Sequence, residues 1–432
     1  MLNTNDEARD ESAADVTGNG EVLRVAEFRR LWVANGFRYS AAEVAAFALP
    51  ITAVVLLHAR PLEISLIFVC SRLGFLLVGL PAGVWVDRWP KKTTLVRADL
   101  AYVAAFGSVP LAYFLGVLSV PQILAVAFMA SLAGVFFDVA HTSVLPQILP
   151  KRRVADANAR LQTSENAIEA VSPSLAGVLT QSVAAPVLYG FAAVCHLGSV
   201  LLIRRIHPSE DTPQRYDEVE RNFFREIAEG MTILLRQPLL RLLLGQAALN
   251  NFGAGILLSM MPVFLLRGIG VSPSVFGFLS TLGALAGLAA SLVCPRLRRR
   301  VGEIRMTLVF SALAPFAVLA APLASVFRTV AVPLVASAEI LIGFVVVGRA
   351  VATAGLRARV TPARLMGRVT AANSVVTQGA TPLGALTGGV IASASSTTAA
   401  LWVGVLEMTI PIVLLLTSSL RHHRTLPPEW EV

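Results

Sequence analysis

The sequence predicts an all-α membrane protein with twelve transmembrane helices, arranged as two six-helix repeats, and with both termini in the cytoplasm. Of its 432 residues, 55% are hydrophobic and only 15% are charged, whereas a soluble domain carries roughly 25% charged residues. A soluble fold of this composition would expose large apolar patches. The apolar stretches are about 20 residues long, which is the length of a membrane-spanning helix. Lipid is therefore the expected solvent.

Twelve such stretches are separated by charge clusters and by Pro or Gly turns. The fifth is the least apolar, because its first half, from Asp156 to Glu169, is polar. The expected spans are 30–58, 62–86, 93–116, 120–147, 155–182, 185–205, 238–266, 272–295, 304–326, 329–356, 366–394 and 398–420.

The basic residues support this count and set its orientation. The odd-numbered loops contain only Arg60, Arg267 and Arg328 of the 36 Lys and Arg residues, and four more lie within spans. The other 29 lie on the opposite side, which the positive-inside rule assigns to the cytoplasm. The net charge of +9 therefore reflects topology, and no nucleic-acid partner is expected. The four basic residues within spans are Arg38, Arg72, Arg160 and Arg349.

The expected spans divide the chain into two bundles, 28–206 and 238–420. Residues 1–27 are expected to form an acidic, disordered cytoplasmic tail rather than a signal peptide, because residues 1–20 are polar. The linker 207–237 contains a predicted amphipathic helix over 216–236, lying on the membrane surface. A solvated linker helix is the alternative. Residues 421–432 form the second cytoplasmic tail.

The two bundles resemble each other in sequence. Ser71-Arg-Leu-Gly74 recurs as Ser280-Thr-Leu-Gly283, and Ser172-Pro173 recurs as Thr381-Pro382, both at an offset of 209 residues. Independent matches at one offset indicate an internal duplication. Two six-helix repeats suit alternating access around a central site.

A charged motif follows the second span. It reads Gly83-x-x-x-Asp87-Arg88-x-Pro90-Lys91-Lys92 and resembles the signature of the major facilitator superfamily, with Pro90 in place of a second Gly. The resemblance implies that Asp87 holds the inward gate closed against span eleven. It also implies that the final basic pair reaches an acid low in span four, for which Asp138 is well placed. The alternative is a basic cluster that only orients the chain. The gating candidates are Gly83, Asp87, Arg88, Lys91, Lys92 and Asp138.

Further stretches resemble the branch of exporters that includes macrolide-efflux and enterobactin-exporter proteins. They are Phe136-Phe-Asp-Val-Ala-His-Thr-Ser-Val-Leu-Pro146, Ser172-Pro-Ser-Leu-Ala-Gly177 and Pro382-Leu-Gly-Ala-Leu-Thr-Gly-Gly389. The resemblance implies a secondary exporter driven by protons. The antiporter motif in span five normally reads Gly-Pro, and here Ser172 replaces the Gly.

Ionisable residues inside the spans are functional candidates, because a charge at the bilayer centre costs roughly 2.5–3.5 kcal/mol. A proton carrier must be a carboxylate that can hold and release its proton. The candidates are Glu43, Glu165 and Glu169, and the alternative is a fixed ion pair such as Glu43 with Arg72. His141 is expected to make a hydrogen-bonded helix contact, with a proton relay as the alternative, and His196 is given no role. In the second half only Glu339, Arg349 and Glu407 are comparable.

Polar groups that could line a substrate cavity are Arg38, Arg72, Asn250, Asn251, Asn373 and Gln378. The neutral ones could equally join helices to one another.

The sequence thus predicts a monomeric, multi-pass transporter of the bacterial inner membrane, with a small molecule, protons and the lipid bilayer as its partners. It is expected to export an amphipathic or lipophilic compound by proton antiport. An importer or exchanger of a polar metabolite is the alternative. No enzyme is expected, because the chain contains no HExxH, GxSxG or Walker A motif. No metal or cofactor is expected, and the proton gradient supplies the energy.

Overall fold

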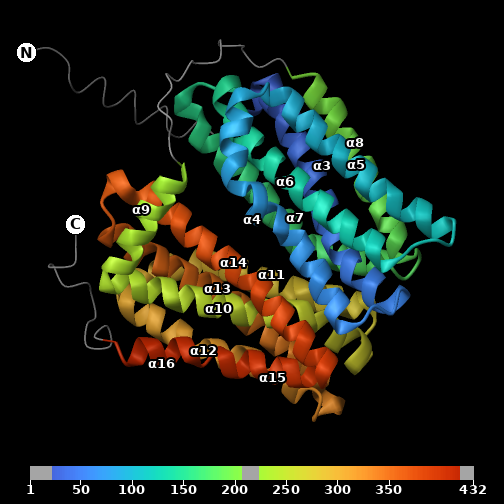
Figure 1. Ribbon diagram of the computed structural model, residues 1–432. Coiled ribbons are helices and arrows are strands. Elements are labelled where there is room, and N and C mark those ends of the chain that lie inside the picture. Colours follow the sequence, from blue (N-terminus) through green and yellow to red (C-terminus); the bar gives the residue numbers. More distant parts are fainter. Residues whose placement is uncertain (1–21, 207–222, 419–432) are drawn as a thin grey trace, which may run out of the picture.

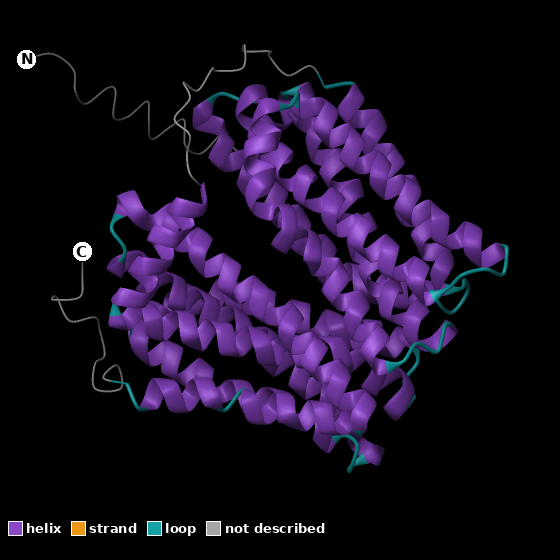
Figure 2. Ribbon diagram, viewed as in Figure 1, coloured by secondary structure: helices purple, strands orange, loops and turns teal. Residues whose placement is uncertain are grey.

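The computed structural model describes residues 22–206 and 223–418, and within them the chain forms helices joined by short turns, without strands (Figures 1 and 2). The two predicted tails and most of the linker lie outside the described residues. The helices of the first half are α3 (Ala26–Ile51), α4 (Pro61–Arg88), α5 (Lys91–Phe114), α6 (Val120–Ile148), α7 (Lys151–Leu179) and α8 (Ala185–Arg204).

The second half begins with α9 (Phe223–Arg236) and repeats the pattern of six long helical segments. These are α10 (Pro238–Val263), α11 (Pro273–Val301), α12 (Glu303–Leu323), α13 (Ala331–Val360), α14 (Met366–Ala394) and a last one split into α15 (Thr397–Glu407) and α16 (Ile410–Leu416). Short turns are η1 (Val22–Arg24), η4 (Arg328–Val330) and η5 (Ala363–Leu365), and π-helical segments extend α3 as η2 (Thr52–Leu56) and α10 as η3 (Phe264–Ile269).

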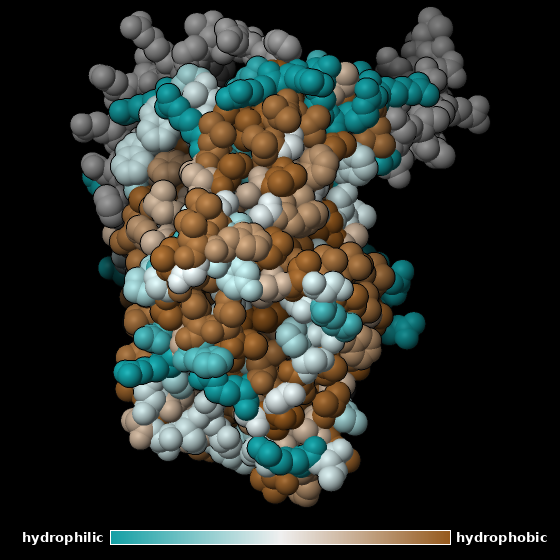
Figure 3. Space-filling view, turned by 90° about the vertical axis from the view of Figure 1, so that its right-hand side faces the viewer, coloured by the Kyte–Doolittle hydropathy of each residue, from teal (hydrophilic) through white to brown (hydrophobic). Residues whose placement is uncertain are grey.

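Ten stretches of the described chain are helical, long and apolar enough to cross a membrane. The two remaining long helices, α7 and α14, have 29 residues each but are more polar and are not among the ten. Apolar side chains cover most of the middle of the face shown in Figure 3, and hydrophilic ones gather toward its ends. The prediction of an all-helical membrane protein is therefore confirmed.

Each half is a ring of helices with the same order of neighbours. In the first half the order of contacts is α7, α3, α8, α5, α6, α4. In the second half it is α14, α10, α15, α12, α13, α11, which is the same order six helices later. The internal repeat found in the sequence is thus also a repeat of packing.

Two seams join the halves. One is formed by α7 and α11 and the other by α4 and α14. At the first seam, the hydroxyl group of Ser174 donates to that of Thr281 at 2.8 Å, and the rings of Phe47 and Phe276 stack at 5.6 Å. A Cβ atom built on Gly277 would lie 2.2 Å from the Pro173 carbonyl oxygen. Such close approach is what small residues permit between helices in a membrane.

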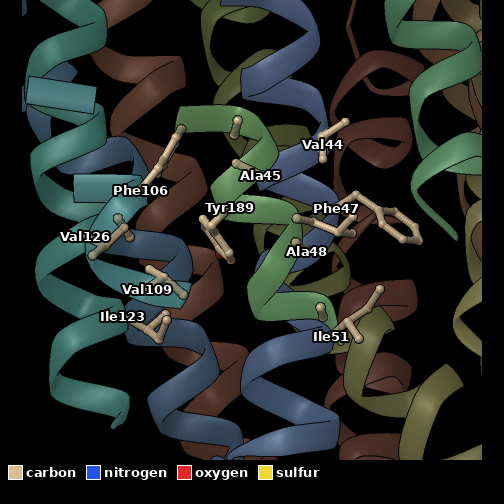
Figure 4. Close-up of a cluster of buried hydrophobic side chains, with 14 of the residues drawn as sticks. Val44, Ala45, Phe47, Ala48, Ile51, Phe106, Val109, Ile123, Val126 and Tyr189 are labelled. Carbon is tan, nitrogen blue, oxygen red and sulfur yellow. The ribbon is translucent and has the colours of Figure 1, made fainter. Parts of the chain in front are cut away.

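The two halves meet at the end formed by η2, η3 and the start of α11, and they diverge toward the end where α9 lies (Figure 1). The core of the first half is packed from α3, α5, α6 and α8, where Tyr189 and Phe106 meet edge to face at 5.6 Å (Figure 4). Phe47 points away from Tyr189 in this view, and it stacks on Phe276 of the other half.

Helix α9 lies within the range predicted for the linker helix, 216–236, and its described part begins at Phe223. Its apolar residues Ile227, Met231 and Leu234 belong to a cluster with α10 and α14. Glu229 pairs with Arg368 of α14 at 2.6 Å. These three residues therefore pack against protein, and the position of α9 at the membrane surface stays a prediction.

Candidate functional site

The centre of the candidate site is an ion pair between two helices that face each other across the ring of the first half. Arg38 lies midway along α3, and its Nη2 atom is 2.5 Å from the Oδ1 atom of Asp138 on α6. The Arg38 side chain is only 11% exposed, whereas that of Asp138 is 69% exposed. A charged group within a span faces a water-filled space rather than lipid. Asp138 therefore indicates which face of α6 is hydrated.

Aromatic contacts hold the arginine in place. The guanidinium carbon of Arg38 lies 4.0 Å from the ring centroid of Phe137, a distance at which a cation is attracted to the ring. The ring of His141 stacks on that of Phe137, one turn earlier in the same helix, with centroids 5.8 Å apart. The predicted hydrogen-bonded contact is not seen at its Nε2 atom, which is buried without a partner in the described chain.

Carboxylates from α3 and α7 form an acidic wall beside this pair. Glu165 accepts a hydrogen bond from Asn35 at 2.8 Å, and the indole of Trp32 donates to Ser164 at 2.9 Å. These bonds fix α7 against α3. Glu43 lies on α3, and Glu165 and Glu169 are four residues apart on α7, so the three predicted proton carriers lie on two helices that pack together.

Glu43 and Glu169 are close enough to interact electrostatically. Neither has a hydrogen-bond or ion-pair partner among the residues that the structure describes. The alternative pairing of Glu43 with Arg72 is not formed, and the Arg72 guanidinium instead lies 5.7 Å from the ring of Phe68. Two neighbouring carboxylates repel each other when both are charged.

The motif after the second span forms the turn between α4 and α5. Trp89 ends α4, and Pro90 precedes the first residue of α5. Lys91 donates to the Val86 carbonyl, while Arg88 is exposed and Lys92 half-buried. Gly83 lies in α4, with open space around the position of a Cβ atom.

The side chain of Asp87 is outside the described part of the chain, so its contact with α14 stays a prediction. The partner of Asp138 differs from the expected basic pair, because Asp138 lies at the depth of Arg38 rather than at the end of α6.

In the second half, the structure places Asn250 and Asn251 within helix contacts. Asn250 is 1% exposed and donates to the Gln246 carbonyl at 2.8 Å. Asn251 donates to Ala247 and accepts from Thr381 of α14 at 3.2 Å. The bond with Thr381 joins α10 to α14 through Asn251, whereas the bond of Asn250 stays within α10.

Asn373 and Gln378 lie further along α14. Their side chains have no hydrogen-bond partner among the described residues, and Gln378 is exposed. Among the described residues, neither Asn373 nor Gln378 forms a hydrogen bond with a residue of the acidic wall.

One buried polar cluster was missed in the sequence. Asp99 of α5 and His196 of α8 are 2.8 Å apart, and Ser199 donates to the other Asp99 oxygen at 2.6 Å. The rings of His196 and Tyr102 are parallel to within 5°, and their centroids are 4.3 Å apart. Asp99 is a charged residue inside a predicted span and could have been identified on that ground. Its partners lie about 100 residues away, and spacing along one helix cannot reveal them.

Glu407 is a second buried acid. It is 8% exposed, and both its carboxyl oxygens are buried without a hydrogen-bond partner in the described chain. It packs against Gly253 of α10. Within the described residues, no group of three or more His, Cys, Asp or Glu side chains could hold a metal ion.

Known proteins resemble this chain in sequence. A family model described as Major Facilitator Superfamily matches residues 31–385. An uncharacterized MFS-type transporter of Sinorhizobium fredii is 27% identical over 323 residues, which cover 74% of this chain and 77% of the relative. Macrolide efflux protein A of Enterococcus faecalis is 30% identical over 178 residues, covering 39% of this chain and 53% of that protein.

Solved structures share the fold. A bacterial homologue of the iron transporter ferroportin in an inward-facing state has a TM-score of 0.74 at 16% identity, covering 91% of this chain and 98% of its own. An outward-facing structure of a bacterial ferroportin homologue gives 0.58 at 20% identity, with 92% and 100% coverage. The arrangement of helices therefore resembles the inward-facing structure more closely.

Proposed function

Because the chain belongs to the major facilitator superfamily, we propose that this membrane transporter exports a small amphipathic or lipophilic compound in exchange for protons. The family consists of transporters, so the protein is not an enzyme. The observation that carries the proposal is the acidic wall of the first half. Glu43 lies on α3, and Glu165 and Glu169 lie on α7, which packs against α3. These three acids have no basic partner among the described residues, which favours a neutral or cationic cargo over an anion.

Export is supported by the sequence relatives. Macrolide efflux protein A of Enterococcus faecalis matches part of the chain, and so does a staphyloferrin A transporter of Staphylococcus aureus, at 21% identity over 244 residues. The first of these names states efflux of a macrolide. A macrolide is therefore the first cargo to test.

The proposed topology has twelve spans, with both termini in the cytoplasm. Helices α7 and α14 complete the two rings beside the seams, and 29 residues of helix are about 43 Å long, enough to cross a bilayer. The polar residues of α7 do not contradict a crossing, because Glu165 is bonded to Asn35 inside the ring. The basic turns at Arg88–Lys92 and Arg296–Arg300 lie at the diverging end of the halves, which supports a cytoplasmic opening.

The location follows from the same argument. The apolar surface and the ten apolar helices require a membrane, and the bacterial relatives indicate the plasma membrane of a bacterium. We propose that the transporter acts as a monomer, since each seam is formed within one chain.

The test is transport by the purified full chain in proteoliposomes with an imposed proton gradient, using a macrolide and a panel of lipophilic cations. We expect gradient-driven movement of at least one compound opposite to the proton flow, abolished by a protonophore. Glu43→Gln should abolish it, whereas Glu63→Gln, at the start of α4 and outside the acidic wall, should not.

Undiminished transport by Glu43→Gln would remove Glu43 from the coupling role. Movement of cargo together with protons, into the compartment that the protons enter, would support the alternative of an importer of a polar metabolite. The structural neighbours include such a protein, a D-xylose–proton symporter at 10% identity.

A further inference from the structure

The end of the molecule where the two halves meet is built around the π-helical ends of α3 and α10. Segments η2 and η3 extend these two helices, occupy equivalent places in the two rings and contact each other. π-Helical turns are rare and occur frequently at functional sites. The last carbonyl groups of any helix lack donors from the helix itself, so the end of η2 presents acceptors to its surroundings.

One side chain of the second half binds a carbonyl group of η2 and a second one in the loop between η2 and α4. Arg267 of η3 donates from Nη2 to the Val54 carbonyl at 2.8 Å and from Nη1 to the Ala59 carbonyl at 3.1 Å. A guanidinium group has donors in a fixed fork and is always charged. Its charge also lies at the negative end of the dipole of the α3–η2 helix. The geometry of its donors, its permanent charge and its position at the helix end all therefore stabilise the two bonds of Arg267 between the halves.

The sequence makes this arginine unusual. Arg267 is one of only three basic residues that the sequence places in the loops on the non-cytoplasmic side. A second one, Arg328, donates to the Gly268 carbonyl at 3.0 Å and so supports η3 within its own half. The third, Arg60, begins α4.

The corresponding position in the first half has a different residue. His58 precedes Arg267 by 209 residues, the offset of the repeat, and it adopts a left-handed conformation with φ of 50°. Among the described residues its side chain makes no hydrogen bond to the second half. The hydrogen bonds between the segment after α3 and the segment after α10 are thus one-sided, because Arg267 donates them and His58 does not.

We propose that Arg267 is a clasp that holds this end of the transporter closed, and that it must release Val54 and Ala59 when the central site opens on this side. The proposal rests on the proposed transport function, since a transporter must alternate between two openings. A separation of the halves by a few ångströms exceeds hydrogen-bonding distance and breaks both bonds together. Loss of the clasp therefore favours the state in which the central site is open at this end of the molecule.

The experiment measures opening directly, without cargo. Spin labels are placed on cysteines at exposed Val55 of η2 and exposed Ser272 before α11. The three native cysteines, Cys70, Cys195 and Cys294, are replaced in this background. The distance distribution of the full chain in lipid nanodiscs then reports the separation of the halves.

We expect Arg267→Ala to raise the ratio of the long-distance to the short-distance population about tenfold or more, because two hydrogen bonds from a charged donor are lost. Arg267→Lys should give a smaller rise, since an ammonium group is a point charge without the planar fork. Arg328→Ala is the matched control. It removes an arginine–carbonyl bond at the same end, but one that does not cross between halves, and it should leave the ratio unchanged.

An unchanged ratio in Arg267→Ala, or an equal rise in Arg328→Ala, would overturn the clasp. If Arg267→Ala fails to fold, the Arg267→Lys distribution decides, because it keeps the charge and the length. Absence of transport by the wild-type protein in proteoliposomes would overturn the proposed function, whereas the distance distributions would still decide the role of Arg267.

Discussion

The buried Asp99 cluster gives the sharpest test of what stabilises the first half. Asp99 accepts hydrogen bonds on both carboxyl oxygens, from His196 and from Ser199, and all three residues are fully buried. Asp99→Ala would leave both partners unsatisfied. Each buried polar group that loses its hydrogen-bond partner costs about 1–3 kcal/mol, so the two lost bonds together are expected to lower the free energy of unfolding by about 2–6 kcal/mol.

Ser199→Ala is the informative comparison, because it leaves the bond between Asp99 and His196 in place. Interhelical hydrogen bonds in membrane proteins average about 0.6 kcal/mol and reach about 1.7 kcal/mol. A hydrogen bond to a charged group lies at the upper end of such ranges, so we expect a loss of about 1–2 kcal/mol. Asp99→Ala should therefore be at least twice as destabilising as Ser199→Ala.

The assay is reversible unfolding in mixed micelles, followed by circular dichroism. Ser143→Ala on α6 is the control, because its hydroxyl donates to the Val139 carbonyl of its own helix at 3.0 Å and joins no second helix. An Asp99→Ala variant no less stable than Ser199→Ala would refute the view that the carboxyl group is the centre of this cluster.

Three further predictions concern the seams and the diverging end. Gly277→Ala should push α11 away from the Pro173 carbonyl and increase the reactivity of an engineered cysteine in the first seam; unaltered reactivity would show that the helices can move aside without opening. Asp87→Asn should shift the balance between the two openings, and unchanged accessibility to a cytoplasmic thiol probe would contradict a role as latch. Glu229→Gln should weaken the contact of α9 with Arg368 and increase proteolysis of the linker, and a cleavage rate equal to wild type would exclude that contact as the anchor of α9.

The sequence predicted the family and the helical membrane fold, and both are confirmed. Apolar length and the alternation of basic loops depend on the bilayer rather than on tertiary contacts, so they can be read along the chain. The repeat offset was also visible in the sequence. Helix α7 was expected to be the least apolar span, and it is one of the two long helices absent from the apolar set.

The partners of side chains were harder to predict. Asp138 was assigned to the basic pair of the motif, but the structure pairs it with Arg38, because the ring order places α3 opposite α6. The apolar face of α9 was assigned to the membrane surface, and the structure adds that Ile227, Met231 and Leu234 pack against α10 and α14. In each case the pattern within a helix identified a polar or apolar face, and only the arrangement of the ring decides what that face meets.

The pairing of the seams has a consequence for the origin of the chain. Gly177 of α7 packs on Pro273 and Ser274 of α11, and in the other seam Gly389 of α14 packs on Leu62 and Ser65 of α4. The fifth helix of each repeat thus meets the second helix of the other, in both directions. This reciprocity is the defining property of an isologous interface in a two-fold dimer. A chain of half this length could have assembled with a second copy through the same two surfaces. Fusion of the two copies then allowed each half to diverge. The acidic wall can therefore belong to one half, and the arginine at the opposite end to the other.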